Sequence, residues 1–201
     1  MAGARRKPRP FRVVVTGGPC AGKSTLCRLL AARFPEAVLV PEAATEVILS
    51  GQTPDGLGQE AFQQKVYERQ IVLEREALRR GAFLICDRGL PDGLAYCPGI
   101  FQRLGVSLEE ALRRYAVVLH IAVIADPETY RLHCAENPAR REDHARALVL
   151  EKTLRKIYSG HPSYHFLWGS LEAKFAAAVR ILLESRRAAQ PPLDFPPEEA
   201  D

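Results

Sequence analysis

The chain has 201 residues, enough for one domain that encloses a hydrophobic core. Its composition, 47% hydrophobic and 26% charged, is ordinary for a soluble globular protein, and no apolar run approaches the length that spans a membrane. The net charge of +4 equals the contribution of four basic residues near the N-terminus: Arg5, Arg6, Lys7 and Arg9. The rest of the chain has equal numbers of basic and acidic residues, so the charge predicts no basic face for nucleic acid.

The five cysteines are widely spaced, odd in number and without a C-x-x-C pair (Cys20, Cys27, Cys86, Cys97 and Cys134). This pattern favours a reducing compartment over a disulfide framework, and it argues against a zinc site. Residues 1–10 are basic, lack the apolar core of a signal peptide and are expected to be a disordered tail. The sequence therefore predicts a cytoplasmic protein.

The first predicted element is a buried strand at residues 13–15, where three valines follow one another. Residues 17–24 then match G-x-x-x-x-G-K-[ST], and leucines at helical spacing predict a helix that ends before Pro35. This strand–loop–helix order is typical of a phosphate-binding loop. It predicts a nucleoside triphosphate site formed by Gly17, Gly18, Pro19, Cys20, Ala21, Gly22, Lys23, Ser24 and Thr25.

The residue types in this loop suit phosphate chemistry. Glycines let the backbone point N–H groups at phosphate oxygens, and the helix N-terminus adds a positive dipole end. Lys23 supplies a charge to the β and γ phosphates, and Ser24 offers a hydroxyl to Mg²⁺. The alternative is a glycine turn followed by a chance Lys-Ser pair. Next to Lys23, the thiol of Cys20 is expected to be open to oxidation, although a small residue that merely fits is the simpler interpretation.

A short apolar strand at 37–40 comes next and leads to Glu42. One or two helical turns at 43–50, a glycine-rich loop at 51–58 and the longest helix, at 59–80, follow. Because Glu42 leaves the second strand at the height of the phosphate loop, it is a candidate base for an attacking hydroxyl. A surface carboxylate is the alternative.

The third strand, at 82–86, ends in Asp87-Arg88-Gly89. In phosphate-loop proteins a carboxylate at this point holds Mg²⁺, directly or through water, so Asp87 and Ser24 are the candidate metal ligands. The alternative is that Asp87 only caps the following turn. Arg88 stands where ATPases of the hexameric motor type usually have a glutamate that polarises water, which argues against a simple hydrolase.

In the rest of the chain, helices again alternate with strands. The patterns predict strands at 116–124 and 164–168. They predict helices at 91–96, 107–115, 128–135, 144–159 and 171–184, the first of them short. The polar stretch 136–143 holds Arg140 and Arg141. We expect it to form a lid whose arginines neutralise phosphate charge in the transition state, with a solvated surface as the alternative. The domain then spans 11–185, and residues 186–201 form a disordered, proline-rich acidic tail.

Strands that alternate with helices predict the α/β class, with a mainly parallel sheet covered by helices on both faces. In such folds ligands bind at the carboxyl ends of the strands. In this chain, the predicted strands end at glycine or acidic residues, namely Gly17, Glu42, Asp87 and Asp126.

Three motifs in the same order resemble those of the NadR-like AAA-type ATPase/kinase family. They are Val-Val-Val-Thr-Gly-Gly-Pro-x-x-Gly-Lys-Ser-Thr, Val-Pro-Glu-Ala-Ala, and a strand that ends Asp-Arg-Gly-x-x-Asp-x-x-Ala-Tyr. The family is related to ribosylnicotinamide, deoxynucleoside and nucleoside-monophosphate kinases, and the resemblance spans about residues 11–185. It implies a three-layer α/β/α P-loop fold. The chain departs from common forms at Cys20, where a smaller residue is more usual.

The resemblance also implies roles for the candidate residues. The loop at 17–25 would bind the phosphates of ATP, Glu42 would act as base toward a sugar hydroxyl, and Asp87 with Arg88 would organise Mg²⁺ and phosphates. Arg140 with Glu142 is similar to the Arg-x-Glu of the family's lid, with Arg141 as the alternative register.

Together these patterns favour a phosphotransferase that uses ATP and Mg²⁺ and acts on a hydroxyl of a nucleoside-like or nucleotide-like small molecule. Its expected partners are ATP and that small acceptor. Two alternatives remain at this point: an ATP hydrolase without an acceptor, and a nucleotide-gated regulatory or binding module. A GTP switch is disfavoured, since the chain has no Asn/Thr-Lys-x-Asp base reader.

Overall fold

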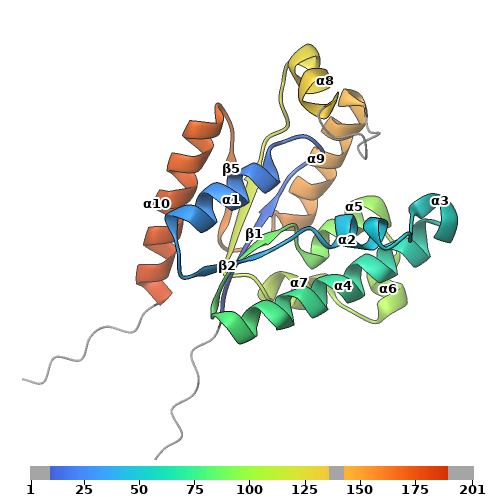
Figure 1. Cartoon of the computed structure of the whole chain (residues 1–201), viewed down its shortest axis with the longest axis horizontal. Coiled ribbons are helices and arrows are strands. Elements are labelled where there is room, and N and C mark those ends of the chain that lie inside the picture. Colours follow the sequence, from blue (N-terminus) through green and yellow to red (C-terminus); the bar gives the residue numbers. More distant parts are fainter. Residues whose placement is uncertain (1–9, 136–142, 190–201) are drawn as a thin grey trace, which may run out of the picture.

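In the computed structural model, which describes residues 10–135 and 143–189, a five-stranded parallel sheet lies between two layers of helices (Figure 1). The strand order is β2-β3-β1-β4-β5, and all four neighbouring pairs are parallel. The predicted α/β class and three-layer arrangement are confirmed. The strands are β1 (Phe11–Thr16), β2 (Ala37–Val40), β3 (Phe83–Asp87), β4 (Val117–Ile121) and β5 (Tyr164–Leu167).

Helices α1 (Lys23–Arg33) and α10 (Leu171–Ala189) cover one face of the sheet, whereas α4 (Gln59–Arg80) and α9 (His144–Tyr158) cover the other (Figure 1). Shorter elements complete the described chain: α2 (Ala43–Leu49), α3 (Pro54–Leu57), the 3₁₀ helix η1 (Leu90–Asp92), α5 (Gly93–Tyr96), α6 (Ile100–Leu104), α7 (Leu108–Arg113) and α8 (Pro127–Ala135).

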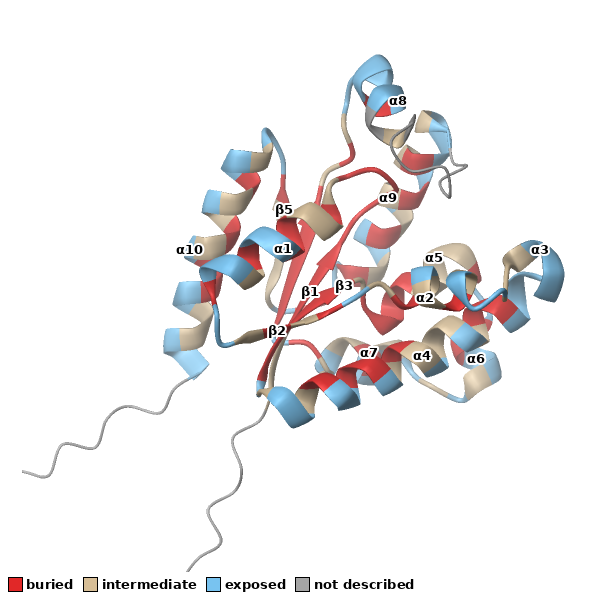
Figure 2. Ribbon diagram, viewed as in Figure 1, coloured by how far each residue is buried: buried red, intermediate tan, exposed pale blue. Residues whose placement is uncertain are grey.

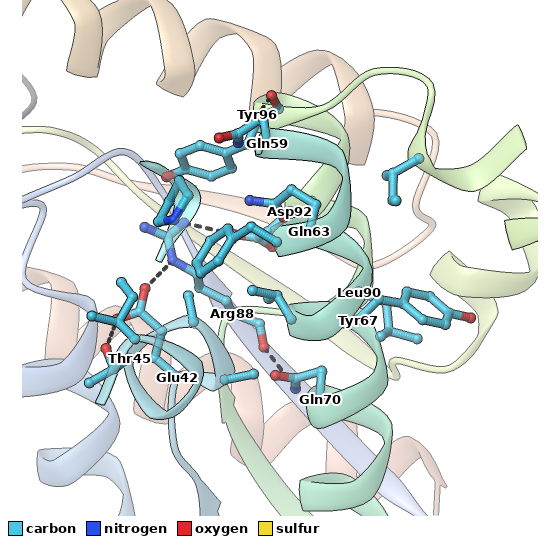
Figure 3. Close-up of a pocket in the computed structure, with 18 of the residues that line it drawn as sticks. Glu42, Thr45, Gln59, Gln63, Tyr67, Gln70, Arg88, Leu90, Asp92 and Tyr96 are labelled. Carbon is cyan, nitrogen blue, oxygen red and sulfur yellow. Dashed lines mark hydrogen bonds and ion pairs between the residues drawn. The ribbon is translucent and has the colours of Figure 1, made fainter. Parts of the chain in front are cut away.

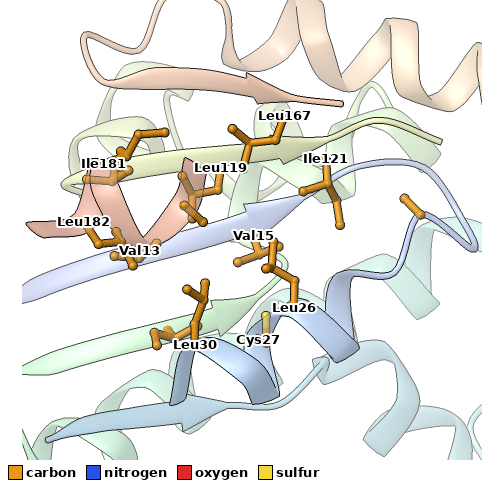
Figure 4. Packing of buried hydrophobic residues seen from close by; sticks show 14 of the residues in the cluster. Val13, Val15, Leu26, Cys27, Leu30, Leu119, Ile121, Leu167, Ile181 and Leu182 are labelled. Carbon is orange, nitrogen blue, oxygen red and sulfur yellow. The ribbon is translucent and has the colours of Figure 1, made fainter. Parts of the chain in front are cut away.

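The two faces of the sheet bury separate apolar clusters, because successive side chains of a strand point to opposite faces. On β1, Val13 and Val15 pack toward α1 and α10, with Leu26 and Leu30 among their buried neighbours (Figure 4). Val14 belongs to the cluster on the other face, under α4 and α9. The central strands β1, β3 and β4 are therefore buried from both sides (Figure 2). Each fully buried Leu or Val contributes about 1.5–3 kcal/mol.

Several local elements differ from the sequence prediction. The loop expected at 51–58 contains the short helix α3, because the side chain of Thr53 accepts a hydrogen bond from Gly56 N and Pro54 begins the turn. The short helix α6 was not predicted. The fourth strand ends at Ile121 rather than at 124, since the chain then leaves the sheet and Val123 N donates to Glu151 on α9.

The last helix continues to Ala189, past residue 185, where the sequence predicts the domain to end. Arg186 explains the extension, because it pairs with Glu36 and its guanidinium lies 4.6 Å from the ring centroid of Phe83. The final turn of the helix therefore packs against the start of β3. The tails at 1–9 and 190–201 and the stretch 136–142 lie outside the described residues. The predicted disordered tails and lid therefore remain predictions there.

Candidate nucleotide-binding site

The phosphate loop connects the end of β1 to the start of α1, as predicted. Gly17 has φ 143° and Gly22 has φ 89°, backbone conformations that favour glycine. A Cβ on Gly17 would lie 2.3 Å from the carbonyl oxygen of Ile121, and one on Gly18 would lie 2.5 Å from a methyl group of Val123. These glycines therefore let the loop pass directly against the chain that leaves β4.

Lys23 is buried, with 3% of its surface exposed, and it begins α1. Its ammonium lies inside the loop, where Nζ donates to the carbonyl oxygen of Gly18 at 2.7 Å. This places a positive charge among the loop's backbone groups, the position from which a lysine contacts the phosphates of a bound nucleotide.

Ser24 and Asp87, the predicted metal ligands, are in contact. Ser24 Oγ donates to Asp87 Oδ2 at 2.5 Å, whereas the buried Oδ1 of Asp87 has no hydrogen-bond partner among the described residues. Burial, reinforced by the charge of Glu42, raises the pKa of Asp87 against the opposing effect of Lys23. A hydroxyl beside a carboxylate with an unused oxygen is a donor set that suits Mg²⁺, which prefers oxygen ligands and retains several waters. The two residues therefore fit the metal.

Among the described residues no group of three or more His, Cys, Asp and Glu side chains is arranged to hold a metal by itself.

Glu42 and Arg88 form an ion pair at the same edge of the sheet. Arg88 Nε donates to Glu42 Oε1 at 2.6 Å, and Thr45 Oγ1 donates to the other carboxylate oxygen at 2.8 Å (Figure 3). Burial alone would raise the pKa of Glu42, but the charges of Arg88 and Lys23 outweigh it and lower this pKa to about 2. Glu42 is therefore ionised at neutral pH and already engaged by two donors.

Arg88 is held in place by Asp92, a residue that sequence reasoning did not select. Arg88 Nη1 donates to Asp92 Oδ1 at 3.1 Å, and the buried Asp92 also accepts from Thr16 Oγ1 at 2.9 Å and from Tyr158 OH at 2.6 Å. Arg88 has φ 74°, which is uncommon for a non-glycine residue. The signal was present in the sequence, since Asp92 is the second aspartate of Asp-Arg-Gly-x-x-Asp.

A cavity of about 420 Å³ opens beside this ion pair, and Pro19 of the phosphate loop also lines it. Helices α2, α4 and α5 form much of its wall, and Figure 3 shows Gln63, Tyr96 and Arg88 around it. Its polar side chains include Glu42, Gln59, Gln63, Gln70, Arg88, Asp92 and Tyr96, and its apolar ones include Phe62, Val66, Tyr67, Leu90, Ile100 and Phe101. The wall of the cavity is thus partly aromatic and carries several side-chain amides.

Gln63 was missed because the stripe on the long helix was interpreted as core. It is buried, and among the hydrogen bonds between described residues none involves its side-chain amide. Gln70 and Glu74 are also buried on α4. Polar residues that recur at helical spacing within an apolar stripe are the signal that marks this cavity wall.

The remaining candidates have different outcomes. Arg140 and Arg141 lie outside the described residues, so their role as lid arginines stays a prediction. The expectation that the cysteines form no disulfide is wrong for one pair, because Cys20 and Cys134 are bonded to each other. The fold brings these residues together across a separation of 114 positions, which the spacing of cysteines along the sequence does not reveal.

The parallel sheet, the phosphate loop and the Ser24–Asp87 pair together define a P-loop protein with a nucleotide-binding domain. A family model described as an AAA domain matches residues 12–174. The chain therefore belongs to this AAA-type P-loop family, whose domain binds and hydrolyses nucleotides. No curated protein matches the chain. None of the helices in the described ranges combines the length and apolar character needed to cross a membrane.

Proposed function

We propose that the chain is a phosphotransferase that moves the γ-phosphate of ATP to a hydroxyl of a small, nucleoside-like or nucleotide-like molecule. The observation that carries this proposal is the Glu42–Arg88 pair, which lines the cavity and, through Arg88, adjoins the candidate metal ligand Asp87. A hydrolase needs only water at this point, whereas a cavity of about 420 Å³ accommodates an organic acceptor.

Each part of the site has a separate role in this reaction. The backbone of the phosphate loop and Lys23 hold the β and γ phosphates, and Ser24 and Asp87 would hold Mg²⁺, which neutralises charge on those phosphates. In the reaction the acceptor oxygen bonds to the γ-phosphorus, the bond from that phosphorus to the β–γ bridging oxygen breaks, and ADP leaves. Arg88, adjacent to Asp87, is placed to stabilise the transferring group.

Glu42 accepts the hydrogen bond of the attacking hydroxyl, which orients its oxygen in line with the γ-phosphate. With a pKa of about 2 it is a weak base, so it receives the proton late, when the new bond to phosphorus makes the hydroxyl acidic. Phosphoryl transfer passes through a loose transition state, and orientation and charge stabilisation contribute most of the rate.

The walls of the cavity support a ring-bearing acceptor. Phe62, Tyr67, Tyr96 and Phe101 provide aromatic surface for a flat ring. The side-chain amide of Gln63, which makes no hydrogen bond to another described residue, can bond to polar atoms on the edge of that ring. The resemblance of the three motifs to those of the NadR-like kinases supports the same proposal.

The test is a screen of nucleosides, nucleotides and other small hydroxyl compounds for release of ADP that depends on the acceptor. The expected result is acceptor-dependent ADP release with formation of a phosphorylated acceptor, identified by mass spectrometry. Turnover of ATP that no acceptor accelerates would favour the hydrolase, and tight Mg²⁺–ATP binding without turnover would favour a regulatory module.

A further inference from the structure

A disulfide joins the phosphate loop to helix α8. Cys20 lies in the loop and Cys134 near the end of α8, and their Cα atoms are 5.8 Å apart, within the range usual for disulfides. Cys27, Cys86 and Cys97 are free thiols and are buried. Of the five cysteines only this pair connects a nucleotide-contacting loop to another element.

Helix α8 packs on the loop through the face that carries Cys134. Tyr130, four residues earlier, is 2% exposed and belongs to the same apolar cluster as Cys20, Ala21 and Val123. Residues four apart lie on one face of a helix, so Tyr130 and Cys134 both face the loop. The disulfide therefore fixes a contact between two elements that already pack together.

We propose that Cys20 and Cys134 form a reversible redox modification site that controls nucleotide binding. Cys20 has φ 55°, a left-handed conformation in which glycine is unstrained and cysteine is uncommon, so the loop holds a thiol at a position that favours glycine. Cys20 is buried, with 6% of its surface exposed, whereas Cys134 is partly exposed, so Cys134 is the thiol that an oxidant in solution reaches first. The inference rests on the proposed binding of nucleotide by this loop.

The oxidant is a low-molecular-weight disulfide. The Cys134 thiol loses its proton and attacks one sulfur of the oxidant, which forms a mixed disulfide and releases the first small thiolate. The Cys20 thiol then loses its proton and attacks Cys134 Sγ, which forms the internal disulfide and releases the second small thiolate. Two electrons pass from the two protein thiols to the oxidant, and the two protons end on the released small thiols.

Oxidation fixes residue 20 relative to α8, and reduction frees it. A phosphate loop adjusts its backbone as it encloses a triphosphate, and the crosslink removes that freedom at the residue next to Ala21 and two before Gly22. We therefore expect the oxidised chain to bind Mg²⁺–ATP at least tenfold more weakly than the reduced chain.

The experiment compares the full-length chain after treatment with glutathione disulfide and after treatment with dithiothreitol. Peptide mapping should find the Cys20–Cys134 link only in the oxidised sample. Hydrogen exchange without ligand should be slower over residues 17–25 when the link is present, and calorimetric titration with Mg²⁺–ATP should show the loss of affinity.

Two variants complete the test. Cys134→Ser removes the pair without altering the loop and should keep the affinity of the reduced parent under both treatments. Cys97→Ala, a buried cysteine elsewhere, is the matched control and should respond to oxidation as the parent does.

Absence of the linked peptide, or equal exchange and equal affinity in both states, would overturn the proposal. If the reduced chain binds no ATP, the proposed function fails, and peptide mapping with hydrogen exchange still decides the redox site: slower exchange in the linked loop supports it and unchanged exchange refutes it.

Discussion

The two oxygens of Asp87 differ in their surroundings. Oδ2 accepts from Ser24, whereas Oδ1 is buried and has no partner in the part of the chain that the structure describes. A buried, unsatisfied carboxylate oxygen costs stability, about 1–3 kcal/mol or more for a charged group, and it is retained where it serves a ligand. On Glu42, by contrast, both oxygens already accept hydrogen bonds. The two carboxylates are therefore suited to different tasks, one to a metal and one to a hydroxyl.

These tasks separate in two substitutions. Glu42→Gln should slow phosphoryl transfer about 10²–10⁴-fold and leave the affinity for Mg²⁺–ATP almost unchanged, because Glu42 lines the acceptor cavity and pairs with Arg88 rather than with the phosphate loop. Asp87→Asn should abolish both transfer and background hydrolysis, since it removes a metal ligand. Because burial raises the pKa of Asp87, the neutral asparagine should be tolerated structurally. Steady-state kinetics with the acceptor from the screen, together with ATP titrations, provide the measurement, and an equally fast Glu42→Gln enzyme would contradict the role of Glu42.

The lowered pKa of Glu42 also predicts a pH dependence of stability. The ordinary value of 4.5 falls to about 2 in the folded chain, and the shift corresponds to about 3 kcal/mol of stabilisation. This contribution is complete above pH 4.5 and is lost as the pH falls through about 2. Urea unfolding should therefore show Glu42→Gln less stable than the parent by up to about 3 kcal/mol at pH 7, with the difference shrinking between pH 4.5 and pH 2. A difference that does not vary with pH would refute the ion-pair explanation.

Among the elements, α4 has two roles: it anchors a buried charge cluster and it lines the cavity. Glu74 is fully buried and pairs with Arg114 at 2.7 Å and with Arg12 at 3.4 Å, and Tyr115 OH donates to it at 2.9 Å. These contacts connect the helix to β1 and to the end of α7. The carboxylate of Glu74 thus balances the charges of two guanidinium groups, those of Arg12 and Arg114.

Glu74→Ala should lower the free energy of unfolding by about 3–5 kcal/mol, because it leaves two partly buried guanidinium groups without their partner. Glu68→Ala, which removes a half-exposed carboxylate on the same helix, is the control and should change stability by less than about 0.5 kcal/mol. Urea denaturation followed by circular dichroism measures both. A loss below about 1 kcal/mol in Glu74→Ala would show that the cluster contributes little.

The cavity face of the same helix predicts a specificity effect. Gln63→Ala should raise the KM for the acceptor about tenfold while the KM for ATP stays constant, because the amide has no partner within the described protein and is free to bond to the acceptor. Gln64→Ala is the matched control, since the neighbouring glutamine faces Glu68 at the surface. An unchanged KM for the acceptor would show that the polar atoms of the acceptor bind elsewhere in the cavity.

At the scale of the whole molecule, the phosphate loop lies where β1, β4, α1 and α8 meet, so a nucleotide bound there should stabilise the entire domain. Mg²⁺–ATP at about 100 times its Kd adds about 2.7 kcal/mol to the free energy of unfolding, which raises Tm by several degrees. Differential scanning calorimetry with and without ligand measures the shift.

Lys23→Ala should abolish most of this shift, because the variant lacks the charge that contacts the β and γ phosphates. Lys152→Ala, an exposed lysine on α9, should keep the full shift. Equal stabilisation of both variants by ATP would remove Lys23 from the nucleotide site.

Much of the fold follows from short-range pattern in the sequence. The apolar runs that became β1, β3 and β4 are buried on both faces, and this continuous hydrophobicity identifies central parallel strands without reference to contacts. Boundaries were less accurate where a distant partner decides them. Strand β4 ends early because of Glu151, and α10 ends late because of Glu36.

The phosphate loop, Asp87 as a candidate metal ligand and the α/β sheet could all be predicted from the sequence, because each depends on local spacing and on the common edge formed by the carboxyl ends of parallel strands. Three contacts became visible only in the folded chain: Asp92 with Arg88, Gln63 with the cavity, and Cys20 with Cys134. These contacts join residues through the packing of separate helices, and the approach of two side chains depends on how whole elements pack, which no short-range pattern encodes.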